Sequence, residues 1–186
     1  MYTYFQERYH FKSIVLLRHP FAIAASSLGF GSNYDWHKKN YSKWSYGHPP
    51  ESGDFFNYYD DKYNLITSPF TLLVFQAVTQ FSHILKNFDT ENSMLVFYED
   101  LVLKPEEVKN QFENFFGENF SEDVFLKQLS KGSFSSAKGH TEQNKMKQIS
   151  KWKQKVSDDD IKDGMKIFKA FDFEPYTDSV LPNKLS

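Results

Sequence analysis

Two short apolar runs, each followed by a proline that can open a helix, constrain the fold more than any other feature of this sequence. The run Ser13–Leu17 reads Ser-Ile-Val-Leu-Leu and is followed by Pro20. The run Met94–Phe97 is also apolar and precedes Pro105. Runs of this kind are typical of strands buried on both faces, and proline is favoured in the first turn of a helix. The repeated strand and helix order therefore predicts an α/β fold with a parallel sheet.

Helix signals divide the rest of the chain. Proline after a capping residue, apolar residues at helical spacing and a closing glycine mark the ends of the expected helices. We predict helices over residues 20–28, 69–86, 105–116, 122–129 and 158–170. Residues 31–67 are rich in aromatic residues, Gly and Pro, and we predict that they form a long irregular insertion. A polar loop is expected over residues 131–147.

The composition bounds the class of protein. The chain has 186 residues, the size of one domain, with a formal net charge of -2 and no cysteine. These values argue against nucleic-acid binding, disulfides and thiolate metal sites. Met1–His10 lacks the pattern of a signal peptide, and the longest apolar stretch, Phe70–Phe81, is too short to span a bilayer. We therefore expect a cytoplasmic protein with no metal and no membrane span.

Arg18 and Tyr98 follow the two predicted strands directly. Ligands of parallel α/β sheets bind beyond the carboxyl ends of the strands, and arginine is suited to phosphate because it is planar and permanently charged. Ser26, about two helical turns into the following helix, would add a hydroxyl donor. On spacing alone an equally good interpretation is structural, with Arg18 paired to Glu99 or Asp100 at the edge of the core.

The first strand and helix resemble part of a known family. Ile14–Ser26 resembles the 3′-phosphate-binding segment of sulfotransferases that use 3′-phosphoadenosine 5′-phosphosulfate (PAPS). The shared pattern is a strand, then Arg-x-Pro, and a serine eight residues after the arginine. Leu95–Leu101 is similar to the family's strand ending in Tyr-Glu-Asp-Leu, and residues 104–117 are similar to its Pro-Glu helix start and its helix end at Gly.

A third family element is a basic loop followed by Trp-Lys, and it is matched here by Lys138-Gly139 with Lys151-Trp152-Lys153. The resemblance covers residues 13–176, apart from the insertion. It implies a P-loop-NTPase-like fold in which helices flank a parallel sheet in three layers. It also implies that Arg18 and Ser26 bind the 3′-phosphate of PAPS, with Tyr98 near the nucleotide and Lys138 as a further contact.

The implied reaction transfers a sulfuryl group from PAPS to a hydroxyl or amine acceptor. Family members hold the 5′-phosphosulfate with an upstream Lys-x-Gly-Thr-Thr loop, and no such sequence occurs in this chain. The resemblance therefore implies that residues 1–186 form a single partial domain, truncated at the N-terminus, that carries the 3′-phosphate half of the site. The alternative is a non-catalytic remnant that binds a nucleotide or a partner. A P-loop kinase fits less well, because the chain has no Gly-x-x-x-x-Gly-Lys-[Ser/Thr] sequence.

The remaining features leave the catalytic base and the acceptor unidentified. His10 is the histidine closest to the family's upstream base, and we interpret it as structural. His19 either orients the turn before the helix or touches phosphate. The aromatic insertion would line an acceptor cleft or form a separate hydrophobic cluster. Truncation would expose one edge of the sheet. We therefore expect the chain either to be less stable than a whole family member or to associate into a homo-oligomer along that edge.

Overall fold

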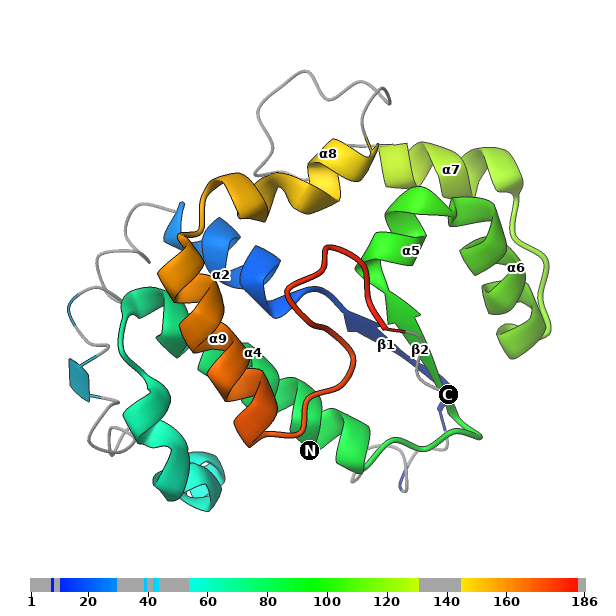
Figure 1. The fold of residues 1–186 in the computed structure, drawn as a ribbon. Helices are drawn as coiled ribbons and strands as arrows, with labels where there is room; N and C mark the ends of the chain where they lie inside the picture. The colour runs from blue at the N-terminus through cyan, green and yellow to red at the C-terminus, as the bar shows by residue number, and fades with distance from the viewer. Residues whose placement is uncertain are drawn as a thin grey trace. The chain divides into compact units, whose positions relative to one another are not determined.

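The computed structural model describes residues 11–29, 54–130 and 145–183, together with residues 8, 39, 42 and 43. Within these residues the chain folds as a mixture of helices with a small parallel sheet, which confirms the α/β class (Figure 1). The chain divides into two compact units. Unit 1 comprises residues 1–18 and 87–149, and unit 2 comprises residues 19–86 and 150–186. The interpretation of residues 1–186 as a single domain stays a prediction.

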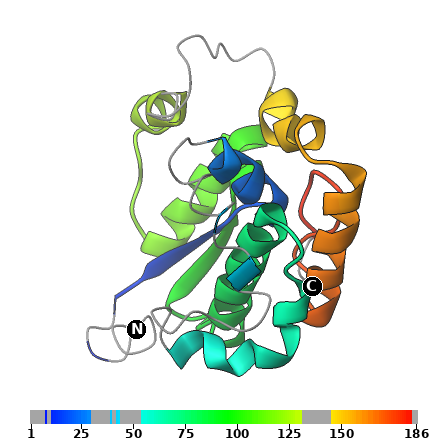
Figure 2. The same ribbon diagram turned by 90° about the vertical axis from the view of Figure 1, so that its left-hand side faces the viewer.

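Unit 1 contains the sheet. Strand β1 (Ser13–Leu17) pairs in parallel with β2 (Ser93–Phe97), so that Leu17 lies opposite Phe97 (Figure 2). Both strands form where the apolar runs predicted them, but the expectation that the first strand is buried on both faces was wrong, because only one face of β1 is covered. Alternate residues of β1 differ in exposure, because Val15 and Leu17 are buried whereas Ile14 and Leu16 are 40% and 48% exposed.

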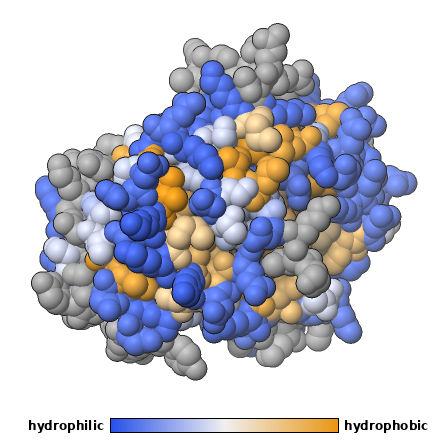
Figure 3. All heavy atoms as spheres, viewed as in Figure 1, coloured by the Kyte–Doolittle hydropathy of each residue, from blue (hydrophilic) through white to orange (hydrophobic). Residues whose placement is uncertain are grey.

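The helices of unit 1 follow β2 in the chain. They are α5 (Tyr98–Leu103), α6 (Pro105–Phe116), α7 (Glu122–Ser130) and α8 (Lys145–Ser150). Helix α6 begins at the predicted proline and ends at Gly117, whose φ of 73° suits a residue without a Cβ atom. Apolar residues gather on the surface over α5 and α7, and Val124 of α7 is 57% exposed (Figure 3).

Unit 2 is helical in its described part. Helix α2 (Pro20–Leu28) packs against α4 (Pro69–Lys86), and α4 packs against α9 (Asp158–Ala170). Two 3₁₀ helices complete it, η2 (Asp54–Leu65) beside α9 and η4 (Lys151–Gln154) beside α2. Helices α2, α4 and α9 have the predicted bounds. Their shared core is aromatic, because the ring of Phe21 lies 4.9 Å from that of Phe168 and 5.4 Å from that of Trp152.

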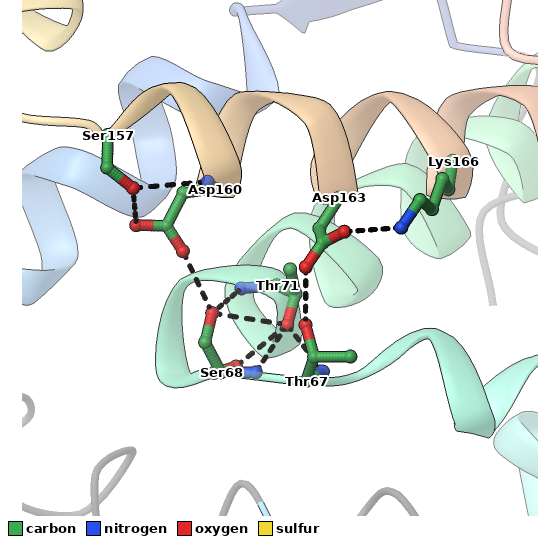
Figure 4. Close-up of polar contacts among 7 residues, drawn as sticks. All are labelled: Thr67, Ser68, Thr71, Ser157, Asp160, Asp163 and Lys166. Atoms are coloured by element: carbon green, nitrogen blue, oxygen red, sulfur yellow. Dashed lines mark hydrogen bonds and ion pairs between the residues drawn. The ribbon is translucent and has the colours of Figure 1, made fainter.

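A polar network joins the first turn of α4 to α9 (Figure 4). Ser68 caps α4 as predicted, since its Oγ accepts from the Thr71 N–H, and it donates to Asp160 Oδ1 at 3.1 Å. Thr67 donates to Asp163 Oδ2 at 3.0 Å, and Lys166 holds the pKa of Asp163 below its ordinary value through a hydrogen bond. Because each hydroxyl is satisfied by a cap or a carboxylate, we interpret this cluster as structural.

Two expectations about irregular segments were wrong in part. Residues 54–65 were expected to be irregular, yet they form η2, with a kink at Tyr59. The burial of two aromatic side chains explains this, because Tyr59 packs against Phe171 and Tyr63 against Phe75. The polar loop was expected to reach residue 147, but α8 begins at Lys145. Here Ile149 and Trp152, three residues apart and both buried, give the segment a helical apolar side.

Candidate anion-binding site

The strand ends of unit 1 bring Arg18 and Tyr98 together. Arg18 follows β1 and Tyr98 follows β2, and the parallel register places the preceding residues, Leu17 and Phe97, opposite each other. The guanidinium carbon of Arg18 lies 4.7 Å from the centre of the Tyr98 ring. A guanidinium at this distance is attracted to the ring face by about 0.5 to 1 kcal/mol or more. The two residues predicted from separate motifs therefore form one cation–π pair.

The Arg18 side chain has an unused hydrogen-bond donor. Its Nε is buried and has no hydrogen-bond partner. Within the described part of the chain Arg18 forms no ion pair, and therefore the alternative pairing with Glu99 or Asp100 is not observed. A buried donor without a partner is costly, and it calls for a ligand or water that accepts from it. An oxyanion next to Tyr98 would provide both the acceptor and the opposite charge.

The Tyr98 hydroxyl is held by a residue that the motifs did not predict. Gln148 of α8 donates from Nε2 to the Tyr98 hydroxyl oxygen at 2.9 Å, across 50 residues of sequence. No short motif encodes such a contact. The only available signal was the helical spacing of Ile149 and Trp152, which would have placed Gln148, one residue beyond the expected loop, on a helix.

His19 lies at the start of α2, in unit 2, and is fully buried. Its Nδ1 accepts from the Phe21 N–H at 3.1 Å and so caps the helix, which confirms the turn-orienting role. Its Nε2 donates to the carbonyl oxygens of Thr177 and Ser179 at 3.1 and 2.9 Å. This pattern requires the neutral ring with hydrogen on Nε2, and both ring nitrogens are already occupied.

Ser26 also belongs to unit 2 and is half-buried near the end of the second turn of α2. Its part in phosphate binding stays a prediction. Lys138, His10 and residues 31–53 of the insertion, apart from residues 39, 42 and 43, lie outside the described residues. The insertion's role as an acceptor cleft stays a prediction.

The described residues contain no group of three or more side chains suited to hold a metal ion. No helix among them is both long enough and apolar enough to cross a membrane.

The comparison with protein families identifies the chain. The model of the sulfotransferase domain matches residues 6–176, and the chain belongs to that family. This confirms the resemblance found in the two strand and helix segments. Membership of this family indicates that the chain is a transferase and that the group transferred is a sulfuryl group. No curated protein and no solved structure gives a significant match.

Proposed function

We propose that this chain binds the 3′-phosphate half of PAPS and takes part in the transfer of its sulfuryl group to a hydroxyl or amine acceptor. The observation that carries the proposal is the Arg18 side chain, which stacks on Tyr98 and keeps a buried Nε–H without a partner. In a chain with only two arginines, one of them, Arg18, follows a strand, and the resemblance of Ile14–Ser26 to the family's 3′-phosphate-binding segment implies that it contacts phosphate. We further propose that the two strands belong to a P-loop-NTPase-like fold, in which helices flank a parallel sheet in three layers. We also propose that the protein is cytoplasmic.

Each residue would have a distinct part in binding. Arg18 would donate to phosphate oxygens with its guanidinium, and its stacking on Tyr98 would keep the guanidinium oriented before the ligand arrives. Ser26 would donate its hydroxyl to the same phosphate, as the family pattern implies. Lys138 would add a second cation. The site suits an anionic nucleotide, because its donor without a partner, Arg18 Nε, belongs to a permanent cation.

PAPS, when bound, supplies the sulfuryl group, and the chain's contribution is to hold and orient the nucleotide. The sequence contains no Lys-x-Gly-Thr-Thr loop. We therefore assign to this chain the binding of the 3′-phosphate and assign no residue as the catalytic base. A chain that binds the nucleotide without transferring sulfate would be the non-catalytic alternative.

The test is calorimetric binding of adenosine 3′,5′-bisphosphate, the product that keeps the 3′-phosphate. Arg18→Ala should weaken binding by about 2 to 4 kcal/mol, roughly thirty-fold to a thousand-fold, because a charged phosphate partner is lost. The matched control is Arg8→Ala, which removes the same charge from an exposed residue and should leave binding nearly unchanged.

Arg18→Lys separates the effect of the positive charge from that of the planar guanidinium. It keeps the charge but loses the planar fork that stacks on Tyr98, and it should bind more weakly than the unchanged chain. Equal binding by the unchanged chain and Arg18→Ala would refute the assignment of the phosphate site. Binding that depends on Arg18, without formation of a sulfated product from PAPS and simple alcohols, phenols or amines, would favour the non-catalytic alternative.

A further inference from the structure

We propose that Gln148 is a positioning residue for the nucleotide site, and that it makes the Tyr98 hydroxyl a hydrogen-bond donor toward the bound ligand. The inference rests on the proposed function, in which Arg18 and Tyr98 contact the nucleotide. It adds a residue that lies outside every motif found in the sequence. All three residues belong to unit 1.

Gln148 is placed by its neighbour in sequence. It lies on α8, where Ile149 is only 3% exposed and anchors the helix, whereas the Gln148 side chain lies at the surface. From there its amide nitrogen donates to the Tyr98 hydroxyl at 2.9 Å. Because the buried Ile149 anchors α8, the backbone of Gln148 is held in place. Its side-chain amide therefore restrains the hydroxyl end of Tyr98.

The restraint on Tyr98 acts on Arg18. The Arg18 guanidinium lies over the Tyr98 ring at 4.7 Å, and a tilt of the ring would move the surface on which the guanidinium rests. Gln148 and Arg18 hold different parts of the same side chain, the hydroxyl and the ring face. The three residues therefore form a chain of contacts that ends at the cation of the site.

The direction of the Gln148 hydrogen bond determines what Tyr98 can offer. A phenol has one hydrogen to donate and accepts through its oxygen. Since Gln148 gives its N–H to that oxygen, the phenol hydrogen points elsewhere, and the described residues provide no acceptor for it. The Arg18 Nε–H also lacks an acceptor. Two neighbouring donors without acceptors suit a ligand that accepts from both, through a phosphate oxygen or an aromatic nitrogen.

The experiment is a double-mutant cycle, measured as the dissociation constant of adenosine 3′,5′-bisphosphate. Gln148→Met has nearly the same shape and removes the donor. It should weaken binding by about two- to ten-fold, the usual effect of one hydrogen bond. In a Tyr98→Phe background the same substitution should have no effect, because the hydroxyl that it positions is gone.

The matched control is Gln111→Met, which makes the same change at an exposed glutamine of α6 and should leave binding unchanged. The unfolding temperature of Gln148→Met should also stay unchanged, since the Gln148 and Tyr98 contact is at the surface. A merely structural role would lower the unfolding temperature and would weaken binding equally in both backgrounds, which would overturn the proposal.

The outcomes separate this inference from the proposed function. Failure of the unchanged chain to bind the nucleotide would overturn both. Binding that collapses in Arg18→Ala but is unaffected by Gln148→Met would leave the phosphate site intact and would overturn only the role of Gln148.

Discussion

Glu113, near the end of α6, is a carboxylate whose pKa is lowered by two hydrogen bonds. Its Oε1 accepts from Lys109 Nζ at 2.7 Å and from the Phe120 N–H at 2.8 Å. The Lys109 bond is the larger cause, and the Phe120 bond adds to it. Because the folded chain prefers the ionised form, Glu113 stabilises the fold above the ordinary glutamate pKa of about 4.3, and this stabilisation is lost as pH falls through the folded value.

We therefore expect Glu113→Gln to lower the urea midpoint of unfolding near neutral pH. The difference from the unchanged chain should shrink as pH falls below the ordinary glutamate range, since both chains are then neutral at this position. Unfolding followed by circular dichroism across this pH range measures it. The matched control is Glu118→Gln, which makes the same change at an exposed glutamate in the following turn. A difference that grows in acid would contradict the assignment.

At the scale of residues, the sequence predicted the position of Arg18 and Tyr98 but not the contact with Gln148. Arg18 and Tyr98 could be predicted because each directly follows a strand, and parallel strands bring their carboxyl ends to one edge. Gln148 could not, because its contact with Tyr98 depends on how α8 folds beyond a 14-residue stretch, residues 131–144, that carries no helix signal. The lack of a partner for Arg18 Nε likewise depends on packing, which spacing does not encode.

At the scale of elements, the Phe21 ring of α2 lies against the backbone of α9 because residue 164 is a glycine. A Cβ atom there would lie 2.5 Å from Cε1 and 2.8 Å from Cζ of Phe21. Phe21 is fully buried beside Phe168 and Trp152, so its ring has little room to move. The glycine thus sets how near this ring lies to α9.

Gly164→Ala should destabilise the protein by about 1 to 2 kcal/mol. Overpacking a core costs about 1 to 3 kcal/mol, and the better helix propensity of alanine offsets up to about 1 kcal/mol of it. Chemical unfolding measures the change. Lys162→Ala, an exposed change on the same helix, should be nearly neutral, and Phe21→Leu should relieve part of the loss in Gly164→Ala. A Gly164→Ala variant that is more stable than the unchanged chain would contradict this, because it would mean that the Phe21 ring moves aside for the added methyl group.

The elements themselves were largely predictable, for identifiable reasons. Helices α4 and α9 carry their capping residues, Ser68 and Ser157, in the sequence, and both caps form. The 3₁₀ helix η2 was missed because most of its residues are Tyr, Phe, Asn and Asp, which are weak helix formers. It is stabilised by the burial of Tyr59 and Tyr63, which the sequence pattern does not reveal.

At the scale of the whole molecule, the small sheet bears on association. Among the described residues it has two strands, so each strand has one edge without a strand partner. On β1 the exposed side chains of Ile14 and Leu16 add apolar area beside that edge. Open edges of this kind pair with other chains unless charge or cover prevents it.

We therefore expect concentration-dependent association in sedimentation velocity, weakened by Leu16→Lys, because a lysine on an edge strand opposes pairing. Val124→Lys is the control, since it removes an apolar side chain of α7 that is at least as exposed as Leu16 and should leave association unchanged. A chain that stays monomeric at every concentration, or one that responds equally to both changes, would contradict an interface at β1.

The hydrogen bonds of His19 also bear on where a working domain ends. The family match stops at residue 176, yet the carbonyl groups that accept from His19 belong to Thr177 and Ser179. Asn183 adds two more bonds, to the carbonyls of Glu174 and Pro175. A recombinant chain trimmed to the family boundary would therefore lose the acceptors of a fully buried imidazole and open the aromatic cluster around it to water. The practical boundary of this sulfotransferase domain lies at or beyond residue 183.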